Sequence, residues 1–318
     1  MSAPSGVRAS SGGGGTWPGL PPYAEWSATC DTLHAYTQVL GKLCVVLAPP
    51  EPQLQHAALR LTARGWETPP LPAPHGGLLV VALDLVTHEA VVEHSGGGRD
   101  RVALTPDRPV GQVTREVLDL VNRSAGPVTI NTQPQEVPWD VPLDQDDLHH
   151  TYDPPSVVRY FAAATYAATV LAALRAPYRG RSTPVNAWWG TFDLAVSLFS
   201  GRPADPPSDD FIMRNSGNAQ QIEVGWWPGD GRYPRAAFYG FAAPAPESFG
   251  RARIAPPEAR WESGMGEYLL DWDAVVAGAD PFAAALEFGR GVVDHACSVC
   301  DWDPALADST HGLPPPVT

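Results

Sequence analysis

The sequence predicts an α+β fold in which antiparallel sheets pack against helices. In the first half, short runs of β-branched and apolar residues are separated by Gly/Pro-containing loops, which is typical of antiparallel strands. Segments with helical apolar spacing lie before and after these runs, which indicates an α+β layer. The second half has the order helix, strands and long final helix. This order resembles a helix-grip-like cup, a fold that holds small molecules between a sheet and a helix, although such a likeness assigns no function.

The first helix is expected from Tyr23 to Lys42, because apolar side chains recur at helical spacing between Leu33 and Leu40. His34, Gln38 and Lys42 recur every four residues and therefore stack along one adjoining side of this helix. They form either a polar wall of a pocket or a solvated edge, and both interpretations stay open.

The remaining elements follow from the same patterns. In the first half, strands are expected at residues 57–63, 78–86, 90–94, 101–104 and 127–132, and a helix at 110–123. In the second half, helices are expected at 155–176 and 281–299, and strands at 182–202, 221–227, 236–243 and 267–272. The chain divides into a disordered leader (1–16), an N-terminal α+β half (17–135), a C-terminal α+β half with a long terminal helix (136–304) and a tail (305–318), with the two halves forming one continuous unit.

Charge and composition exclude several classes of partner. The net charge of −14 over 318 residues argues against nucleic acid and against an anionic membrane surface, because both need clustered Lys and Arg. The longest apolar run, 161–174, is shorter than a membrane span, so no transmembrane helix is expected. The N-terminus lacks the apolar region of a signal peptide, so a cytoplasmic location is expected, where the four cysteines should be reduced.

The segment from Ser182 to Arg202 reads as a buried strand that carries polar residues. Phe192 and Leu194 fall on one face of this strand, whereas Asp193 falls on the other. On a concave surface, Asp193 would be a general base or an anchor for a cationic or hydroxylated ligand. The alternative is a structural aspartate that accepts backbone N–H bonds beside a turn.

A second carboxylate, Glu223, has the same setting. It alternates with Ile222 and Val224 and shares its strand face with Trp227. If Asp193 and Glu223 approach one another, their repulsion raises one of the two pKa values and creates an acid/base pair. Four tryptophans at two strand ends, in the pairs 188–189 and 226–227, favour an aromatic-lined cavity.

Metal and cofactor signals are weak. Cys297 and Cys300, with His295 nearby, have the spacing of half a zinc site, but buried free cysteines in a final helix are the preferred interpretation. His149 lies in an acidic loop, where solvated charge is a sufficient explanation. No phosphate-binding loop, dinucleotide fingerprint, nucleophile elbow or zincin motif is present, so no cofactor is expected.

Short motifs follow one another in a fixed order: Trp17-Pro-Gly-Leu-Pro21, Thr32-Leu-His34, Thr62-Ala-Arg-Gly65, Phe192-Asp-Leu-Ala195, Phe199-Ser-Gly-Arg202 and Trp227-Pro-Gly229. Together they resemble a bacterial domain-of-unknown-function family, from Trp17 to Trp302. The resemblance implies one continuous family unit without an assigned activity. It also implies a divergent member that lacks two histidines of the family pattern: one position holds Asn186, and the other falls within Asn218-Ala-Gln-Gln221.

We therefore expect a bacterial protein that binds a small, largely apolar molecule in a tryptophan-lined pocket. One hypothesis is a cofactor-independent cyclase, isomerase or lyase of specialised metabolism, with Asp193 or Glu223 as the acid or base. The residues expected to bind the ligand are Asn186, Trp188, Trp189, Trp227, Tyr239, His34, Gln38 and Arg202. Two alternatives stay open: a non-catalytic binding or scaffold protein, and a metal-dependent hydrolase or oxidase that uses His34, His149 and carboxylates.

Overall fold

The computed structural model describes residues 16–306. Its helices are α1 (Ser27–Leu47), α2 (Val110–Ala125), α3 (Pro154–Arg175), α4 (Phe211–Ser216), α5 (Trp272–Ala277) and α6 (Pro281–Val299), with 3-10 turns η1 (Tyr23–Glu25), η2 (Pro52–Ala57), η3 (Phe249–Arg251) and η4 (Pro304–Leu306). Its strands are β1 (Arg60–Leu61), β2 (Gly65–Glu67), β3 (Leu71–Pro72), β4 (Leu78–Asp84), β5 (Glu89–His94), β6 (Arg99–Ala103), β7 (Asn186–Trp188), β8 (Asp193–Pro203), β9 (Ala219–Trp227), β10 (Ala237–Ala243), β11 (Arg260–Glu262) and β12 (Glu267–Asp271).

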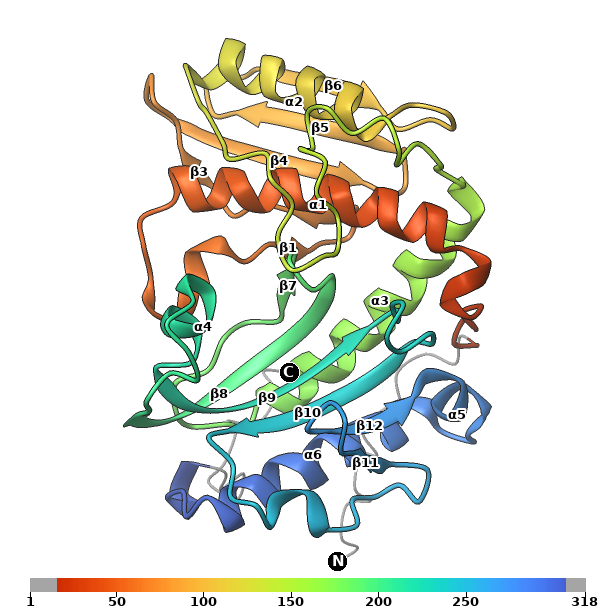
Figure 1. Ribbon diagram of the computed structural model, residues 1–318, viewed down its shortest axis with the longest axis vertical. Coiled ribbons are helices and arrows are strands. Elements are labelled where there is room, and N and C mark those ends of the chain that lie inside the picture. The colour runs from red at the N-terminus through yellow and green to blue at the C-terminus, as the bar shows by residue number, and fades with distance from the viewer. Residues whose placement is uncertain (1–15, 307–318) are drawn as a thin grey trace, which may run out of the picture.

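The strands form two antiparallel sheets of six strands each. The first sheet has the order β1-β2-β4-β5-β6, with β3 paired to β4, and the second has the order β11-β12-β10-β9-β8-β7. The two sheets meet where Leu59 and Ala187 exchange both of their backbone hydrogen bonds, each with an N···O distance of 3.0 Å. This bridge lies between β1 and β7 near the middle of the molecule (Figure 1).

The long helices cover one face of each sheet. Helices α1 and α2 contact each other and the first sheet, whereas α3 and α6 contact each other and the second sheet (Figure 1). The apolar sides of these helices and sheets join in one buried cluster that includes residues from both halves, among them Leu33, Leu83, Tyr160, Leu194 and Phe288. The α+β class with antiparallel sheets and packed helices, expected from the sequence, is confirmed.

Helix α3 is long and apolar enough to meet the length and composition criteria for a membrane span. Part of this apolar surface lies in the core, because Tyr160, Ala164 and Leu171 are buried and the helix packs on β8, β9 and α6. It begins at Pro154 because the Asp153 side chain accepts a hydrogen bond from the Ser156 N–H and the prolines occupy the first turn.

Three expected elements differ from the structure. Of the strand expected at residues 57–63, only Arg60–Leu61 (β1) is formed, because Ala57 still belongs to η2 and the chain turns between Thr62 and Gly65. Residues 127–132 form no strand, and the Val128 N–H bonds to the Asn122 side chain instead of to a neighbouring strand. The stretch from Ser182 to Arg202 is not one strand but a hairpin, in which β7 and β8 pair antiparallel around residues 189–192. The turn could not be distinguished from a strand by its apolar residues, because Trp189 and Phe192 are buried even though they lie between the strands. The expected leader and tail lie mostly outside the described residues.

Candidate functional site

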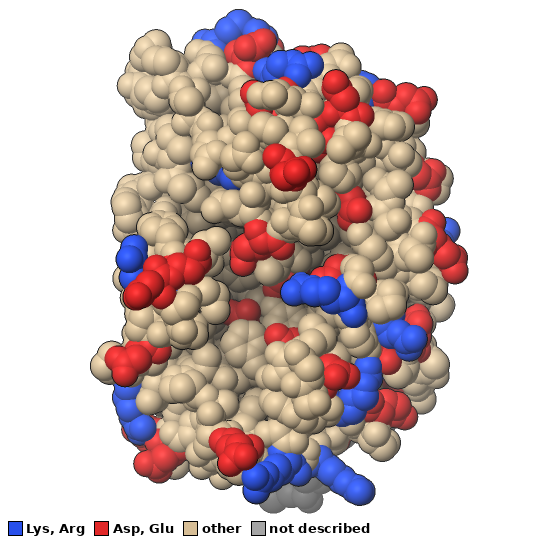
Figure 2. Space-filling view, viewed as in Figure 1, with Lys and Arg blue, Asp and Glu red and all other residues tan. Residues whose placement is uncertain are grey.

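A cavity of about 610 Å³ lies against the second sheet, on the face opposite α3 and α6. Strands β8, β9, β10 and β12 supply its floor, while η2, α4 and the segment around Glu136 stand around it. Figure 2 shows a hollow in this face of the molecule with several acidic side chains around it. A helix-grip-like cup would place its ligand between sheet and helix, whereas here the helices fill one face of the sheet and the cavity lies on the other.

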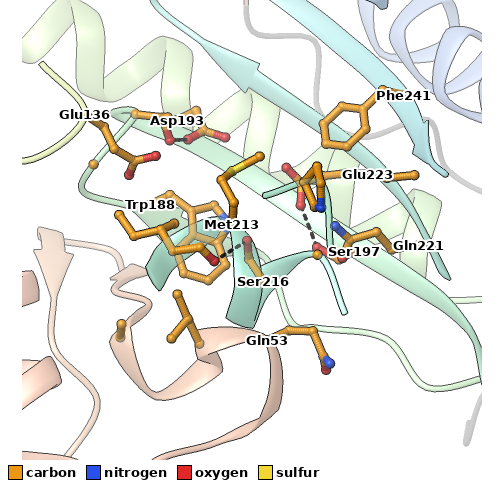
Figure 3. Close-up of a pocket in the computed structure, with 18 of the residues that line it drawn as sticks. Gln53, Glu136, Trp188, Asp193, Ser197, Met213, Ser216, Gln221, Glu223 and Phe241 are labelled. Carbon is orange, nitrogen blue, oxygen red and sulfur yellow. Dashed lines mark hydrogen bonds between the residues drawn. The ribbon is translucent and has the colours of Figure 1, made fainter. Parts of the chain in front are cut away.

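The alternation of side chains along the strands decides which residues reach this cavity. Leu194, Ile222 and Phe238 point into the shared core with the helices. Their neighbours Asp193 and Glu223 point the other way and line the cavity (Figure 3), and Tyr239 lines it as well. The face assignments made for the two central strands from the sequence therefore hold in the structure.

The three polar side chains on the cavity floor form one hydrogen-bonded system. The Tyr239 hydroxyl donates to Asp193 Oδ2 and lies 3.3 Å from Glu223 Oε1. Thr191 donates to the other Asp193 oxygen, and Ser197 donates to Glu223 Oε2 over 2.7 Å (Figure 3). The convergence of Asp193 and Glu223, which the sequence left open, is therefore present: one tyrosine hydroxyl links them.

A glycine makes this arrangement sterically possible. Tyr239 of β10 pairs with Gly225 of β9, and a Cβ atom at position 225 would overlap the end of the tyrosine ring. With no side chain at that position, the ring lies across β9 and its hydroxyl reaches β8. Tyr239 is only 7% exposed and Asp193 only 4%.

Burial changes the protonation of this system. Desolvation raises the pKa of Asp193 to about 6, against the opposing hydrogen bonds from Thr191 and Tyr239. Desolvation, together with the nearby Asp193 charge, raises the pKa of Glu223 to about 7. Burial also raises the pKa of Tyr239 well above its usual value, so this phenol stays protonated near neutral pH. Midway between these two pKa values, at about pH 6.5, the two carboxyl groups therefore share roughly one proton.

Two more carboxylates, Glu267 and Glu136, lie near this pair in the cavity lining. Glu267 of β12 lies beside the Tyr268–Gly240 pair and points to the cavity side of the sheet. Desolvation, reinforced by Asp193, raises the pKa of Glu267 to about 7. Glu136 reaches in from the opposite side, next to Gly190, where any side chain would overlap its carboxylate (Figure 3). Burial raises its pKa as well, and the Asp193 charge adds to this effect.

The walls of the cavity are mainly apolar. Trp188, Trp227 and Phe241 lie on the sheet side, and the T-shaped contact between Trp227 and Tyr239 has a ring separation of 5.5 Å. Met213 comes from α4, which begins after Asp210 because that side chain accepts the N–H groups of residues 212 and 213. Helix α4 contacts η2 and closes one side of the cavity.

The turn before β8 is fixed from the core side. Phe192 has a left-handed backbone with a φ of 58°, and its ring stacks between Trp66, Tyr160 and His34 at centroid distances of 4.9–5.2 Å. His34 Nε2 lies 2.8 Å from the Trp189 carbonyl oxygen. Burial lowers the pKa of His34 to about 4, so its neutral ring donates to this carbonyl. The strained turn sets the point at which Asp193 begins β8.

Six of the ten site residues named from the sequence line the cavity: Asp193, Glu223, Trp188, Trp189, Trp227 and Tyr239. The remaining four lie outside its lining. Asn186 is fully buried between Arg60 Nη1 at 2.6 Å and Gln55 Oε1 at 2.8 Å, so it joins β7 to the first half of the chain. Arg202 lies at the exposed end of β8 and donates to the Asp301 carbonyl.

His34 and Gln38 are neither a direct cavity wall nor a solvated edge. Both are buried with Lys42, which contradicts the solvated alternative. Gln38 exchanges two hydrogen bonds of 2.9 Å with the backbone of Gln135, and this holds the neighbouring Glu136 at the cavity. These helix residues support the site from behind.

Sequence reasoning missed Glu267, Glu136 and the apolar side chains of α4. Alternation could have identified Glu267, because its strand places Glu267 and Leu269 on one face and Tyr268 on the other. No local pattern identifies Glu136, because it lies in a loop that reaches the cavity only through the hydrogen bonds of Gln135.

The candidate metal ligands are dispersed in the structure. Within residues 16–306, no group of three or more His, Cys, Asp and Glu side chains has a metal-holding arrangement. Cys297 is buried in α6, and His295 Nε2 lies 2.8 Å from the Phe249 carbonyl oxygen. His149 pairs with Asp146 over 2.6 Å.

The chain belongs to a family described as "Family of unknown function (DUF5996)", whose model matches residues 17–309. This match confirms the family-level resemblance drawn from the ordered motifs. No curated protein and no solved structure matches the chain.

Proposed function

We propose that this family member binds a small organic molecule in the cavity and that Asp193, Tyr239 and Glu223 transfer protons to and from it. The single observation that carries the proposal is the tyrosine hydroxyl that links two carboxylates on the floor of an apolar cavity. A carboxyl group whose pKa is raised toward neutral pH can act as a general acid or base there, and burial provides that condition here.

The chemistry follows from the protonation states. Near pH 7, Asp193 is the more ionised carboxylate and accepts a proton from a C–H or N–H group of the ligand. Glu223, whose pKa is higher, donates its proton to another atom of the same ligand. The Tyr239 hydroxyl then passes the proton from Asp193 to Glu223 and restores the starting state. The ligand loses one proton and gains one, so the net reaction is an isomerisation that needs no oxidant or reductant.

Deuterium exchange tests this proposal without knowledge of the natural substrate. The protein is incubated in D2O with a panel of small ketones and cyclic imines, and loss of their C–H signals is followed by proton NMR. We expect catalysed exchange that is fastest between about pH 6 and 7 and falls at least 100-fold in D193N and E223Q. Glu287→Gln, on the exposed side of α6, is the matched control and should exchange normally.

Exchange that is equal with wild type, D193N and E223Q would contradict the acid/base roles. Binding of panel compounds without any exchange would instead support the second candidate, a non-catalytic binding protein. That candidate is favoured by the apolar walls of the cavity, which suffice to bind a ligand without chemistry.

We further propose that Asn186 replaces a histidine of the family pattern without changing the cavity chemistry. Its side chain bonds to Arg60 and Gln55 and lies outside the cavity lining, so the replacement alters the contact between the two halves of the chain. A variant with histidine at this position (Asn186→His) should change thermal stability and leave proton exchange at the Asp193–Glu223 pair intact. Loss of exchange in a folded variant would contradict this assignment.

A further inference from the structure

We propose that the ligand of this cavity is an organic cation: an ammonium group attached to an apolar, preferably aromatic, body. The inference rests on the proposed function, because it names the class of molecule that the same cavity binds. It refines the expectation of a largely apolar ligand by adding one positive charge. The ammonium group would lie between Glu267 and Glu223, and the apolar body would lie against the aromatic wall.

The charge balance of the lining is the first support. Six carboxylates line the cavity: Glu136, Asp193, Asp205, Glu223, Asp230 and Glu267. Arg232 is the single Lys or Arg side chain among the described lining residues, and it pairs with Asp230 over 2.8 Å. Its side chain is 82% exposed, so it lies at the rim and leaves the inner carboxylates without a cation. An anionic ligand would be repelled from this interior, whereas a cation would be attracted.

Glu267 provides a second, separate observation. Within residues 16–306 its side-chain carboxylate forms no hydrogen bond and no ion pair, although the residue lies partly buried in the cavity wall. Asp193 and Glu223, by contrast, have hydroxyl partners, namely Thr191, Tyr239 and Ser197. A carboxylate that is partly removed from water without a partner destabilises the protein, and a bound ammonium group supplies the missing donor.

The apolar walls define the rest of the ligand. Trp188, Trp227 and Phe241 offer aromatic surface, and Met213 and Met265 add flexible apolar side chains. Aromatic faces attract cations as well as apolar groups. A volume of about 610 Å³ is in the range of cavities that enclose drug-sized molecules. A bare metal ion or a small inorganic cation would leave most of this apolar surface unused.

Matched pairs of probes separate charge from shape. Calorimetric titrations compare 2-phenylethylamine with 2-phenylethanol, tryptamine with tryptophol, and cyclohexylethylamine with cyclohexylethanol, each at pH 8.0 and pH 5.5. The amines are protonated at both values, whereas Glu223 and Glu267 become largely neutral at the lower one. We expect at least one amine to bind ten-fold or more tightly than its alcohol at pH 8.0, with most of that preference lost at pH 5.5.

The variant E267Q should lower amine affinity about ten-fold at pH 8.0 and leave alcohol affinity unchanged, while E287Q on α6 changes neither. Thermal melts of each variant check folding, and if E267Q does not fold, the comparison of wild type at two pH values carries the test. Alcohols that bind as tightly as their amines overturn the cation inference and leave the small-molecule function standing. If no member of any pair binds, both proposals fail.

Discussion

Replacing Glu223 with glutamine should stabilise the folded protein, and this stabilisation should grow as the pH rises. Glu223 is removed from water among apolar walls and lies close to the Asp193 charge. Both effects disfavour its ionised form and raise its pKa from 4.5 to about 7. Below pH 4.5 the carboxyl group is neutral in both the folded and the unfolded chain, so it carries no penalty. As the pH rises from 4.5 to 7, the unfolded chain ionises more readily than the folded one, so the stability falls, and above pH 7 the loss is complete.

The size of this effect follows from the two pKa values. A difference of about 2.5 pKa units corresponds to roughly 3 kcal/mol of unfolding free energy at high pH, of which about 1.4 kcal/mol is already lost at pH 5.5. Glutamine carries no charge at any pH, so the stability of E223Q relative to wild type should rise by roughly 2 kcal/mol between pH 5.5 and pH 8.0. The amide of E223Q accepts weaker hydrogen bonds from Ser197 and Tyr239 than the carboxylate does, which lowers the unfolding free energy of the variant by about 1 kcal/mol at both pH values.

Urea denaturation followed by circular dichroism at pH 5.5, 6.5, 7.0 and 8.0 measures the effect. All four values lie above the isoelectric point near 4.9, where the protein would be least soluble. E287Q serves as the control, because it removes an equally negative but exposed side chain. A difference between E223Q and wild type that stays constant from pH 5.5 to 8.0 would refute the conclusion that Glu223 ionises in a dehydrated site.

Three further predictions test the geometry. Tyr239→Phe should uncouple the two carboxyl groups, so that proton exchange falls at least ten-fold in a protein that still folds; unchanged exchange would remove the relay role of the hydroxyl. Gly225→Ala should destabilise the protein by about 1–3 kcal/mol and displace the Tyr239 ring, measurable by urea denaturation and near-UV circular dichroism, since the new methyl group meets that ring. Asn186→Ala should lower the unfolding free energy by about 1–3 kcal/mol through its buried partners Arg60 and Gln55, while amine binding by calorimetry stays within two-fold of wild type; a larger loss of binding would place Asn186 in the ligand site.

The strand face of Asp193 was accessible from the sequence because side chains alternate along any strand. The same rule assigned Glu223 and Trp227 to one face of their strand, but only the pairing of β8 with β9 in the folded chain brings the two polar faces to the same side of the sheet. The bounds of the last helix were also local: the expected helix over 281–299 has the same bounds as α6, because Asp280 caps it and Pro281 begins it, whereas the first helix, expected at 23–42, is α1 over Ser27–Leu47.

The hairpin between β7 and β8 needed tertiary information. Its turn residue Phe192 is held in a left-handed conformation by stacking on Trp66 and Tyr160, and both of these partners lie in distant parts of the chain. A local pattern of apolar residues contains no sign of such partners, so the stretch read as one strand. The surroundings of Asn186 could not be read from the sequence for the same reason, because Arg60 and Gln55 contact it only after the two halves of the chain have packed.

The sequence by itself therefore determined the fold class, the family and the polar faces of the central strands, because these depend on periodicity and ordered motifs. Only the tertiary structure decided which side of the sheet is hollow, that Tyr239 links Asp193 to Glu223 across Gly225, and that Glu267 faces the cavity without a partner within residues 16–306. Those features depend on contacts between residues far apart in the chain and on the dehydration that packing creates, and both arise only when the chain folds.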